Sequence, residues 1–164
     1  EEDIRRAHVV CPLAAVQNRY SMMARAYESL FPVLEELGIG FVAFSPLANG
    51  LLTGIYDKSS TFEAGDMRAR MPQFSAAAME ENGQLLALLQ NIAEERGATC
   101  GQIALAWMLC KKPYIVPIPG TRKYSRLAEN AGAANIVLTA EDVAAIDARL
   151  ETIPMSAVFG IIRK

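Results

Sequence analysis

The chain has 164 residues, 52% of them hydrophobic and 21% charged, and its formal net charge is −2. This composition is typical of a soluble globular protein, and the length predicts a single domain over residues 1–164. Because the chain has neither a large positive charge nor an apolar run of membrane-spanning length, we expect neither nucleic acid nor a membrane as partner. The cysteines, Cys11, Cys100 and Cys110, form no CxxC pair, which favours buried, inert thiols in a reducing, cytoplasmic compartment over disulfides or a zinc site.

The first half of the chain predicts two strands and a helix between them. Residues 1–8 are expected to be the end of a helix, and residues 14–18 a strand. Ser29 is a predicted helix cap, with Pro32 in the first turn, and Gly38 is a predicted helix stop. Residues 41–46 predict a second strand that is apolar on both faces, as is typical of parallel sheets.

The second half begins with an irregular segment and then returns to clear periodicity. Residues 48–82 predict a long loop with no more than one helical turn. Further helices are predicted at residues 83–96 and 125–133. A capping box of Thr99 and Gln102 predicts the start of another helix, and the last predicted helix runs from Thr139 to Leu150. Residues 114–119 predict a third strand, so the class is α/β with parallel strands. Three strands buried on both faces need neighbours at their edges, and this sheet therefore looks incomplete.

Polar or small residues lie at the end of each predicted strand. The first strand ends in Gln17-Asn18, the second in residues 45–50 and the third in residues 119–123. Because ligands bind at the carboxyl ends of parallel strands, these segments predict one shared site. Backbone amides at 120–121, with Arg126 and either Lys123 or Arg122, would suit a phosphate. The alternative is a surface turn followed by a solvated helix face.

Several further residues have a functional and a structural interpretation. Phe44 could cover a flat ring or belong to the core, and Gln17 could bind a primary amide or only end a strand. His8 is expected to be structural, because it precedes the first strand and so lies at the end opposite the predicted site. Asp66, Arg68 and Arg70 could close over an anion or form a solvated loop. The sequence predicts no nucleophile–base pair and no metal cluster.

Four segments together resemble the carboxyl-terminal half of the aldo-keto reductases: "AAVQNRYSM", "ELGIGFVAFSPLANGLLTG", "QIALAWML" and "VPIPGTRKYSRLAEN". The resemblance covers roughly residues 4–150. The family is an eight-stranded (β/α) TIM barrel that binds NADPH and transfers hydride to an aldehyde or ketone. The resemblance implies a partial barrel made of family strands six, seven and eight with flanking helices. It also implies that residues 48–82 are a long loop on the cofactor side.

The resemblance implies an NADP(H) site on named residues. Gln17 would hold the nicotinamide carboxamide, and Phe44 would stack on the nicotinamide ring. The pyrophosphate would lie against a loop containing Ser45, Pro46, Leu47, Asn49, Gly50 and Leu51. The 2′-phosphate would lie against Gly120, Thr121, Lys123 and Arg126, and the adenine beside Glu129 and Asn130.

The resemblance implies no catalytic residue in this chain. The family's catalytic Asp, Tyr, Lys and His lie on earlier strands, and Tyr20, Tyr27, Lys58 and His8 do not match them. We therefore expect the chain to be inactive alone, and a small carbonyl substrate to bind only in a complete barrel. The alternatives are a self-standing dinucleotide-binding or scaffold module and a relative of the potassium-channel β subunits. The open sheet edges predict a homo-oligomer or a missing amino-terminal half as partner.

Overall fold

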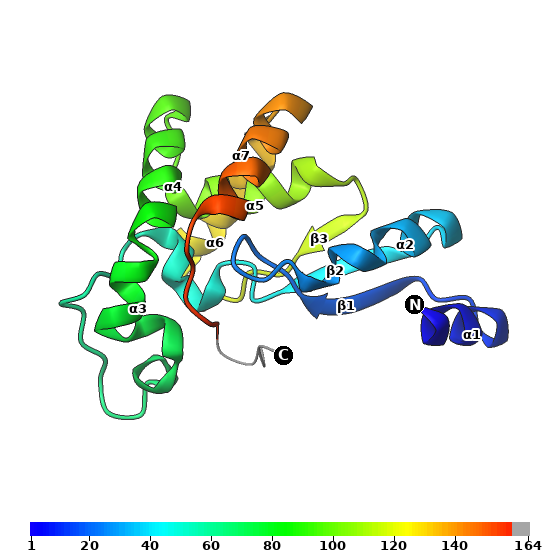
Figure 1. The fold of residues 1–164 in the computed structure, drawn as a ribbon, viewed down its shortest axis with the longest axis horizontal. Coiled ribbons are helices and arrows are strands. Elements are labelled where there is room, and N and C mark those ends of the chain that lie inside the picture. The colour runs from blue at the N-terminus through cyan, green and yellow to red at the C-terminus, as the bar shows by residue number, and fades with distance from the viewer. Residues whose placement is uncertain (159–164) are drawn as a thin grey trace.

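The computed structural model describes residues 1–158 of the chain (Figure 1). Its strands are β1 (Ala15–Arg19), β2 (Gly40–Phe44) and β3 (Ile115–Pro117). Its α-helices are α1 (Glu2–Val10), α2 (Phe31–Leu37), α3 (Ala76–Glu81), α4 (Gly83–Arg96), α5 (Cys100–Lys111), α6 (Tyr124–Gly132) and α7 (Ala140–Thr152). Short 3-10 helices η1 to η5 cover Ala26–Leu30, Ala48–Thr53, Met67–Arg70, Pro72–Phe74 and Ala133–Asn135.

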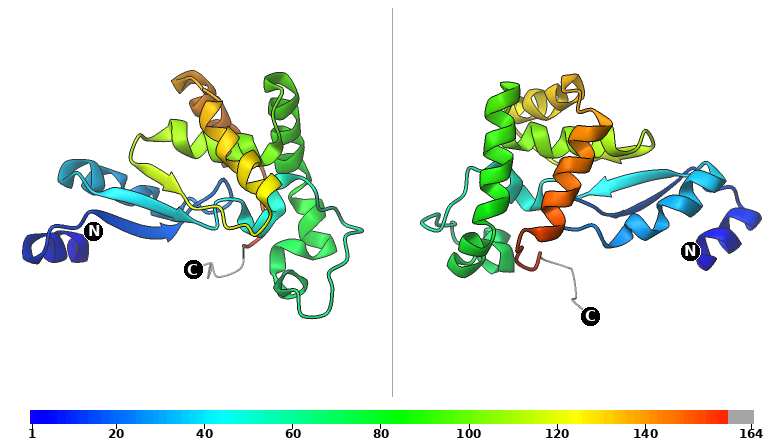
Figure 2. Two further views of the ribbon diagram at one scale, coloured as in Figure 1. Left: turned by 180° about the vertical axis from the view of Figure 1, so that it is seen from behind. Right: turned by 45° about the horizontal axis from the view of Figure 1, so that its top comes forward.

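The three strands form one parallel sheet in the order β1-β2-β3. Gln17 is the register partner of Val42, which is in turn the partner of Val116. Parallel neighbours require crossover connections, and helices occur in each of them, as Figures 1 and 2 show. The prediction of an α/β fold with three parallel strands is confirmed, and the described residues do not form a closed barrel.

One face of the sheet is covered by helices and contains the core. Phe41 is fully buried there, with its ring centroid 5.5 Å from that of Tyr20 and 5.6 Å from that of Phe31 at the start of α2. The Tyr20 ring also stacks on Trp107 of α5, at 5.5 Å between centroids. Aromatic contacts of this kind add stability beyond the buried area, so β1, β2, α2 and α5 are joined around one cluster.

The opposite face of the sheet is open. Gln17 is exposed on β1, and Val116 and Ile118 of the β3 segment are 54% and 45% exposed. Alternation along the strands places Phe44 on this same face, because Phe41 and Ala43 point into the core. We call this surface, from Gln17 across Phe44 to Ile118, the open face.

Local sequence signals explain the helix ends that were predicted correctly. The Thr99 hydroxyl accepts a hydrogen bond from the Gln102 amide while the Gln102 side chain accepts one from the Thr99 amide, and Thr139 and Asp142 form the same capping box. Gly38 ends α2 with φ of 64°, a left-handed conformation that glycine adopts without a steric penalty.

Three expectations need correction. Ser29 does not cap α2: it lies within η1, and its hydroxyl donates to the Ala26 carbonyl at 3.4 Å. Residues 48–82 contain α3 and three short 3-10 helices rather than one helical turn. Cys11 is exposed, whereas Cys100 is buried as expected.

His8, the single histidine, has a structural contact, because its Nδ1 accepts a hydrogen bond from the Leu13 amide at 3.1 Å. Within residues 1–158, no helix has the length and apolar character needed to cross a membrane.

Candidate functional site

A cleft of about 460 Å³, which we call the main cleft, lies where the segments after β2 and β3 meet. The β2 side contributes the loop that starts at Ser45, and the β3 side contributes Ile118 to Gly120 and then Arg126 of α6. The full lining is Ser45, Pro46, Leu47, Asn49, Gly50, Thr53, Ile55, Tyr56, Asp66, Met67, Arg68, Met71, Ile118, Pro119, Gly120 and Arg126. Two of the three strand-end segments that were expected to share a site line this cleft, whereas Gln17 and Asn18 of the first segment do not.

The loop after β2 has an unusual backbone. The non-glycine residues with positive φ in the described part of the chain are Ser45, Ala48 and Asn49, at 53°, 48° and 62°. All of them lie in this loop, and each such conformation costs free energy that the surrounding structure must compensate. Residues in strained conformations cluster at ligand-binding sites, so the strain supports a binding role for this loop.

Gly50 fits the loop for two reasons. Its φ is 100°, and a Cβ atom at this position would lie 3.2 Å from Cε2 of Tyr56. Any other residue would combine backbone strain with a crowded contact to the ring. The Tyr56 ring therefore packs directly on the backbone that lines the cleft.

The other wall of the cleft is held by Arg68. Its guanidinium forms an ion pair with Asp66, and Asp66 Oδ1 also accepts from the Arg68 amide at 2.9 Å. The same guanidinium donates to the Tyr56 hydroxyl and lies over the rings of Tyr56 and Phe62, at 5.0 Å and 5.2 Å from their centroids. Internal contacts therefore hold Arg68 in an ordered cleft wall, whereas Arg70 of the same loop is exposed.

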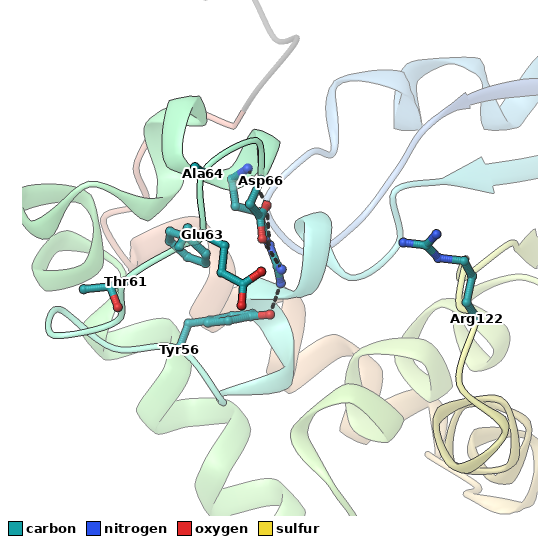
Figure 3. A pocket seen from close by; sticks show the side chains of 8 residues that line it. Tyr56, Thr61, Glu63, Ala64, Asp66 and Arg122 are labelled. Atoms are coloured by element: carbon teal, nitrogen blue, oxygen red, sulfur yellow. Dashed lines mark hydrogen bonds and ion pairs between the residues drawn. The ribbon is translucent and has the colours of Figure 1, made fainter.

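Arg68 also borders a second cleft of about 610 Å³, shown in Figure 3. Tyr56 and Asp66 lie together on one side of it, and Arg122 extends toward it from the segment after β3. Cations therefore stand on both sides of the space between the loop 56–68 and the turn that follows β3.

The turn after β3 presents its cations to solvent. The Thr121 hydroxyl accepts a hydrogen bond from the Lys123 amide at 3.1 Å, which fixes the turn, and Lys123 is the N-cap residue of α6. Lys123 and Arg126 are exposed, and Arg126 lines the main cleft. Exposed cations at a helix start suit an anionic group such as a phosphate.

Glu129 is tied to the neighbouring helix. Its Oε1 accepts from the Thr99 hydroxyl at 2.8 Å, and its backbone carbonyl accepts from Gln102 Nε2 at 2.9 Å. The capping box of α5 thus also fixes the position of α6, which carries Arg126 and the partly buried Asn130.

The end of β1 contributes a residue that the sequence did not single out. Arg19 is the register partner of Phe44, and its Cζ lies 5.0 Å from the centroid of the Phe44 ring. Gln17 lies two residues earlier on the same strand, so Gln17, Arg19 and Phe44 share the open face.

The structure brings together half of the fourteen expected binding residues along the main cleft: Ser45, Pro46, Leu47, Asn49, Gly50, Gly120 and Arg126. Leu51 is fully buried and does not line the cleft. Gln17 and Phe44 lie on the open face rather than in the cleft lining.

Thr53, Ile55, Tyr56 and Met71 line the cleft without having been predicted to do so. No local spacing in the sequence identifies them, because the folding of residues 48–82 is what carries them there.

Comparison with known proteins decides the family. Residues 2–151 match the model of the aldo/keto reductase family. The chain is an aldo-keto reductase family member. Aldo-keto reductase str7 of Strobilurus tenacellus is 45% identical over 147 residues, which are 87% of this chain and 44% of the relative. Probable aldo-keto reductase 1 of Glycine max is 35% identical over 160 residues, which are 97% of this chain and 45% of the relative.

Solved structures agree with this assignment. The glycerol dehydrogenase AKR11B4 of Gluconobacter oxydans superposes with a TM-score of 0.81 at 26% identity, over 99% of this chain and 49% of its own. The thermostable aldo-keto reductase Tm1743, solved with the inhibitor epalrestat, gives a TM-score of 0.61 at 26% identity, over 88% of this chain and 43% of its own. The chain thus spans about half the length of the family members it matches.

No cluster of metal-ligating side chains occurs within residues 1–158. The polar groups in the cleft lining are backbone amides, the Asn49 side-chain amide, hydroxyls, the Asp66–Arg68 ion pair and the Arg126 cation. Apart from the Asp66 carboxylate, these groups suit a phosphate-bearing organic ligand.

Proposed function

We propose that this chain forms the NADP(H)-binding part of an aldo-keto reductase that reduces aldehydes or ketones to alcohols. The observation that carries the proposal is the convergence of the strained loop from Ser45 to Gly50 with Gly120 and Arg126 on one cleft. In an α/β fold, the carboxyl ends of parallel strands are where a dinucleotide binds.

The cleft and the turn after β3 fit the phosphate groups of such a ligand. The loop 45–50 would hold the pyrophosphate, and Lys123 and Arg126 would hold the 2′-phosphate. Glu129 and Asn130 would flank the adenine, and Thr121 would add a hydroxyl to the 2′-phosphate site. Since Lys123 and Arg126 are exposed, they can reach a phosphate without first breaking an internal ion pair.

The open face fits the nicotinamide end. Gln17 is exposed and would bond the carboxamide, while Phe44 would offer its ring as a platform. The bound dinucleotide would supply the hydride that reduces the carbonyl group. The residues of this chain would orient the dinucleotide, and we assign none of them as the proton donor.

Substrate binding and proton donation would then need a more complete barrel. Our proposal is that the chain is catalytically inactive alone, acts in the cytoplasm, and associates through its open sheet with a copy of itself or with an amino-terminal half. Exposed apolar residues such as Val116 and Ile118, together with unpaired strand edges, support an association of this kind.

Dinucleotide titration tests the proposal. The chain and the double variant Lys123→Ala/Arg126→Ala are each titrated with NADPH and with NADH, following the fluorescence of the reduced nicotinamide. Losing the charged hydrogen bonds of both cations should weaken NADPH binding by about a hundredfold or more, because each bond is worth about 1.5–3 kcal/mol, and should leave NADH binding nearly unchanged. Arg149→Ala, at an exposed arginine of α7, is the control and should alter neither.

Equal losses for the two dinucleotides would show that these cations do not recognise the 2′-phosphate. The absence of any dinucleotide binding by the unmodified chain would refute the proposed function as a whole.

A further inference from the structure

Arg19 is set apart from the other partly buried cations by its lack of an acidic partner. The other partly buried Lys and Arg side chains among residues 1–158 each form an ion pair with a carboxylate: Arg5, Arg25, Arg68, Lys111 and Lys112. Arg19 forms no ion pair in that range, and its NH1 is shielded from solvent without a hydrogen-bond partner.

The surroundings of Arg19 do not stabilise its charge by a counter-ion. Desolvation alone lowers the pKa of its guanidinium, and no carboxylate opposes that effect. The compensating contact is the Phe44 ring, whose centroid is 5.0 Å from Cζ, and a cation over an aromatic face gains only a modest attraction. An uncompensated positive charge therefore remains beside the ring of Phe44.

A positive charge in partly desolvated surroundings discriminates between ligands by their charge. Its interaction with a second charge is several times stronger there than in bulk water. A flat ring resting on Phe44 would share these surroundings, and the two oxidation states of a nicotinamide differ by one positive charge on that ring. The reduced ring is neutral, whereas the oxidised ring is cationic and would be repelled.

We propose that Arg19 makes this site prefer the reduced, uncharged nicotinamide dinucleotide over the oxidised, cationic one. The inference rests on the proposed function, since it takes Phe44 as the platform of the nicotinamide ring. Arg19 is then a specificity-determining residue that favours carbonyl reduction by favouring the cofactor that carries the hydride.

The test compares the dissociation constants of NADPH and NADP⁺ in the unmodified chain and in variants at Arg19. NADPH is titrated by fluorescence, and NADP⁺ by competition. We expect NADPH to bind more tightly by about threefold to tenfold, the size of a partly screened charge–charge interaction. Arg19→Gln should bring the ratio of the two constants close to one, mainly by tightening NADP⁺, while Arg19→Lys should keep it.

A purely structural role for Arg19 would change both constants in parallel and leave their ratio unmoved. Arg19→Met keeps the apolar length of the side chain and replaces Arg19→Gln where that variant does not fold.

If the unmodified chain binds NADPH more tightly than NADH, and Arg19→Gln leaves the ratio of the NADPH and NADP⁺ dissociation constants unchanged, this inference alone is overturned. No dinucleotide binding by the unmodified chain overturns the proposed function and this inference with it.

Discussion

Two consecutive lysines at the end of α5 allow a matched test of how this fold is stabilised. Lys111 Nζ lies 2.7 Å from Glu28 Oε1 and 2.9 Å from Asp147 Oδ2, and its side chain is only 10% exposed. Lys112 pairs with Glu35 instead, with side chains 36% and 45% exposed. Replacing each lysine by methionine removes one charge while keeping most of the side-chain volume.

The cost of Lys111→Met follows from what it leaves behind. Glu28 keeps hydrogen bonds from Arg25 and from the Tyr20 hydroxyl, the latter at 2.6 Å. Asp147 keeps the bond from Trp107 Nε1 at 2.9 Å. Breaking a buried ion pair by removing one partner costs about 3–5 kcal/mol, and the remaining donors reduce this to about 2–3 kcal/mol.

Lys112→Met should cost about 0.5 kcal/mol or less, because the ion pair that it breaks is much more exposed to solvent than that of Lys111. Urea unfolding followed by Trp107 fluorescence measures both variants. With an m-value of about 2 kcal/mol per molar, Lys111→Met should lower the midpoint by about 1 M and Lys112→Met by about 0.2 M. Equal midpoint shifts would refute the argument that burial decides the contribution of these pairs.

Four further predictions concern the loop after β2, the Glu28 carboxyl, the activity of the chain and its assembly. Gly50→Ala should destabilise the chain by about 1–3 kcal/mol in urea, because of its φ of 100° and its approach to Tyr56, whereas Gly83→Ala, with open space around it, should be neutral or stabilising; equal effects would contradict this. Burial would raise the pKa of the Glu28 carboxyl, but hydrogen bonds from Arg25, Lys111 and Tyr20 lower it below its ordinary value of 4.5. Its contribution to stability is therefore present above about pH 4.5 and lost as the pH falls through the lower folded-state pKa; Lys111→Met should flatten that loss, and an unchanged acid limb would contradict it. Purified chain should show no aldehyde-dependent oxidation of NADPH, and oxidation that co-purifies with the chain would refute this. Sedimentation at micromolar concentration should show association, and a monodisperse monomer would refute it.

The elements that the sequence predicted well are those whose signals are local. The capping boxes at Thr99 and Thr139 and the left-handed Gly38 each depend on residues within one helical turn. The three strands were recognised as short apolar runs, with ends shifted by one or two residues. Ser29 failed as a cap because its hydroxyl bonds backward within η1, an alternative that helix spacing alone does not exclude.

The folding of residues 48–82 was not predictable in the same way. The rings of Tyr56, Phe62 and Phe74 contact one another at 5.2–5.5 Å between centroids, and Arg68 adds its guanidinium to two of them. These contacts join positions 6 to 18 residues apart without helical or strand periodicity. Tyr56 and Arg68 consequently reach the cleft through tertiary packing that the sequence pattern does not reveal.

The candidate site also combines residues that the sequence indicated with residues that only the structure identifies. Strand ends indicated where Ser45 and Gly120 would meet, because parallel topology alone determines that edge of the sheet. Arg19 gave no signal, since only the structure shows that a cation next to Phe44 lacks a carboxylate.

Two independent destabilising features lie at the carboxyl ends of the strands. The backbone of Ser45, Ala48 and Asn49 is strained, and the charge of Arg19 is partly buried without an acidic partner. On the helical side, by contrast, Lys111 and Arg25 are matched by carboxylates. The exposed cations of the turn after β3 cost little and are weak evidence by themselves, because solvent screens them. Strain and uncompensated charge do cost stability, so finding both at the carboxyl ends of the strands supports our proposal that a ligand binds there.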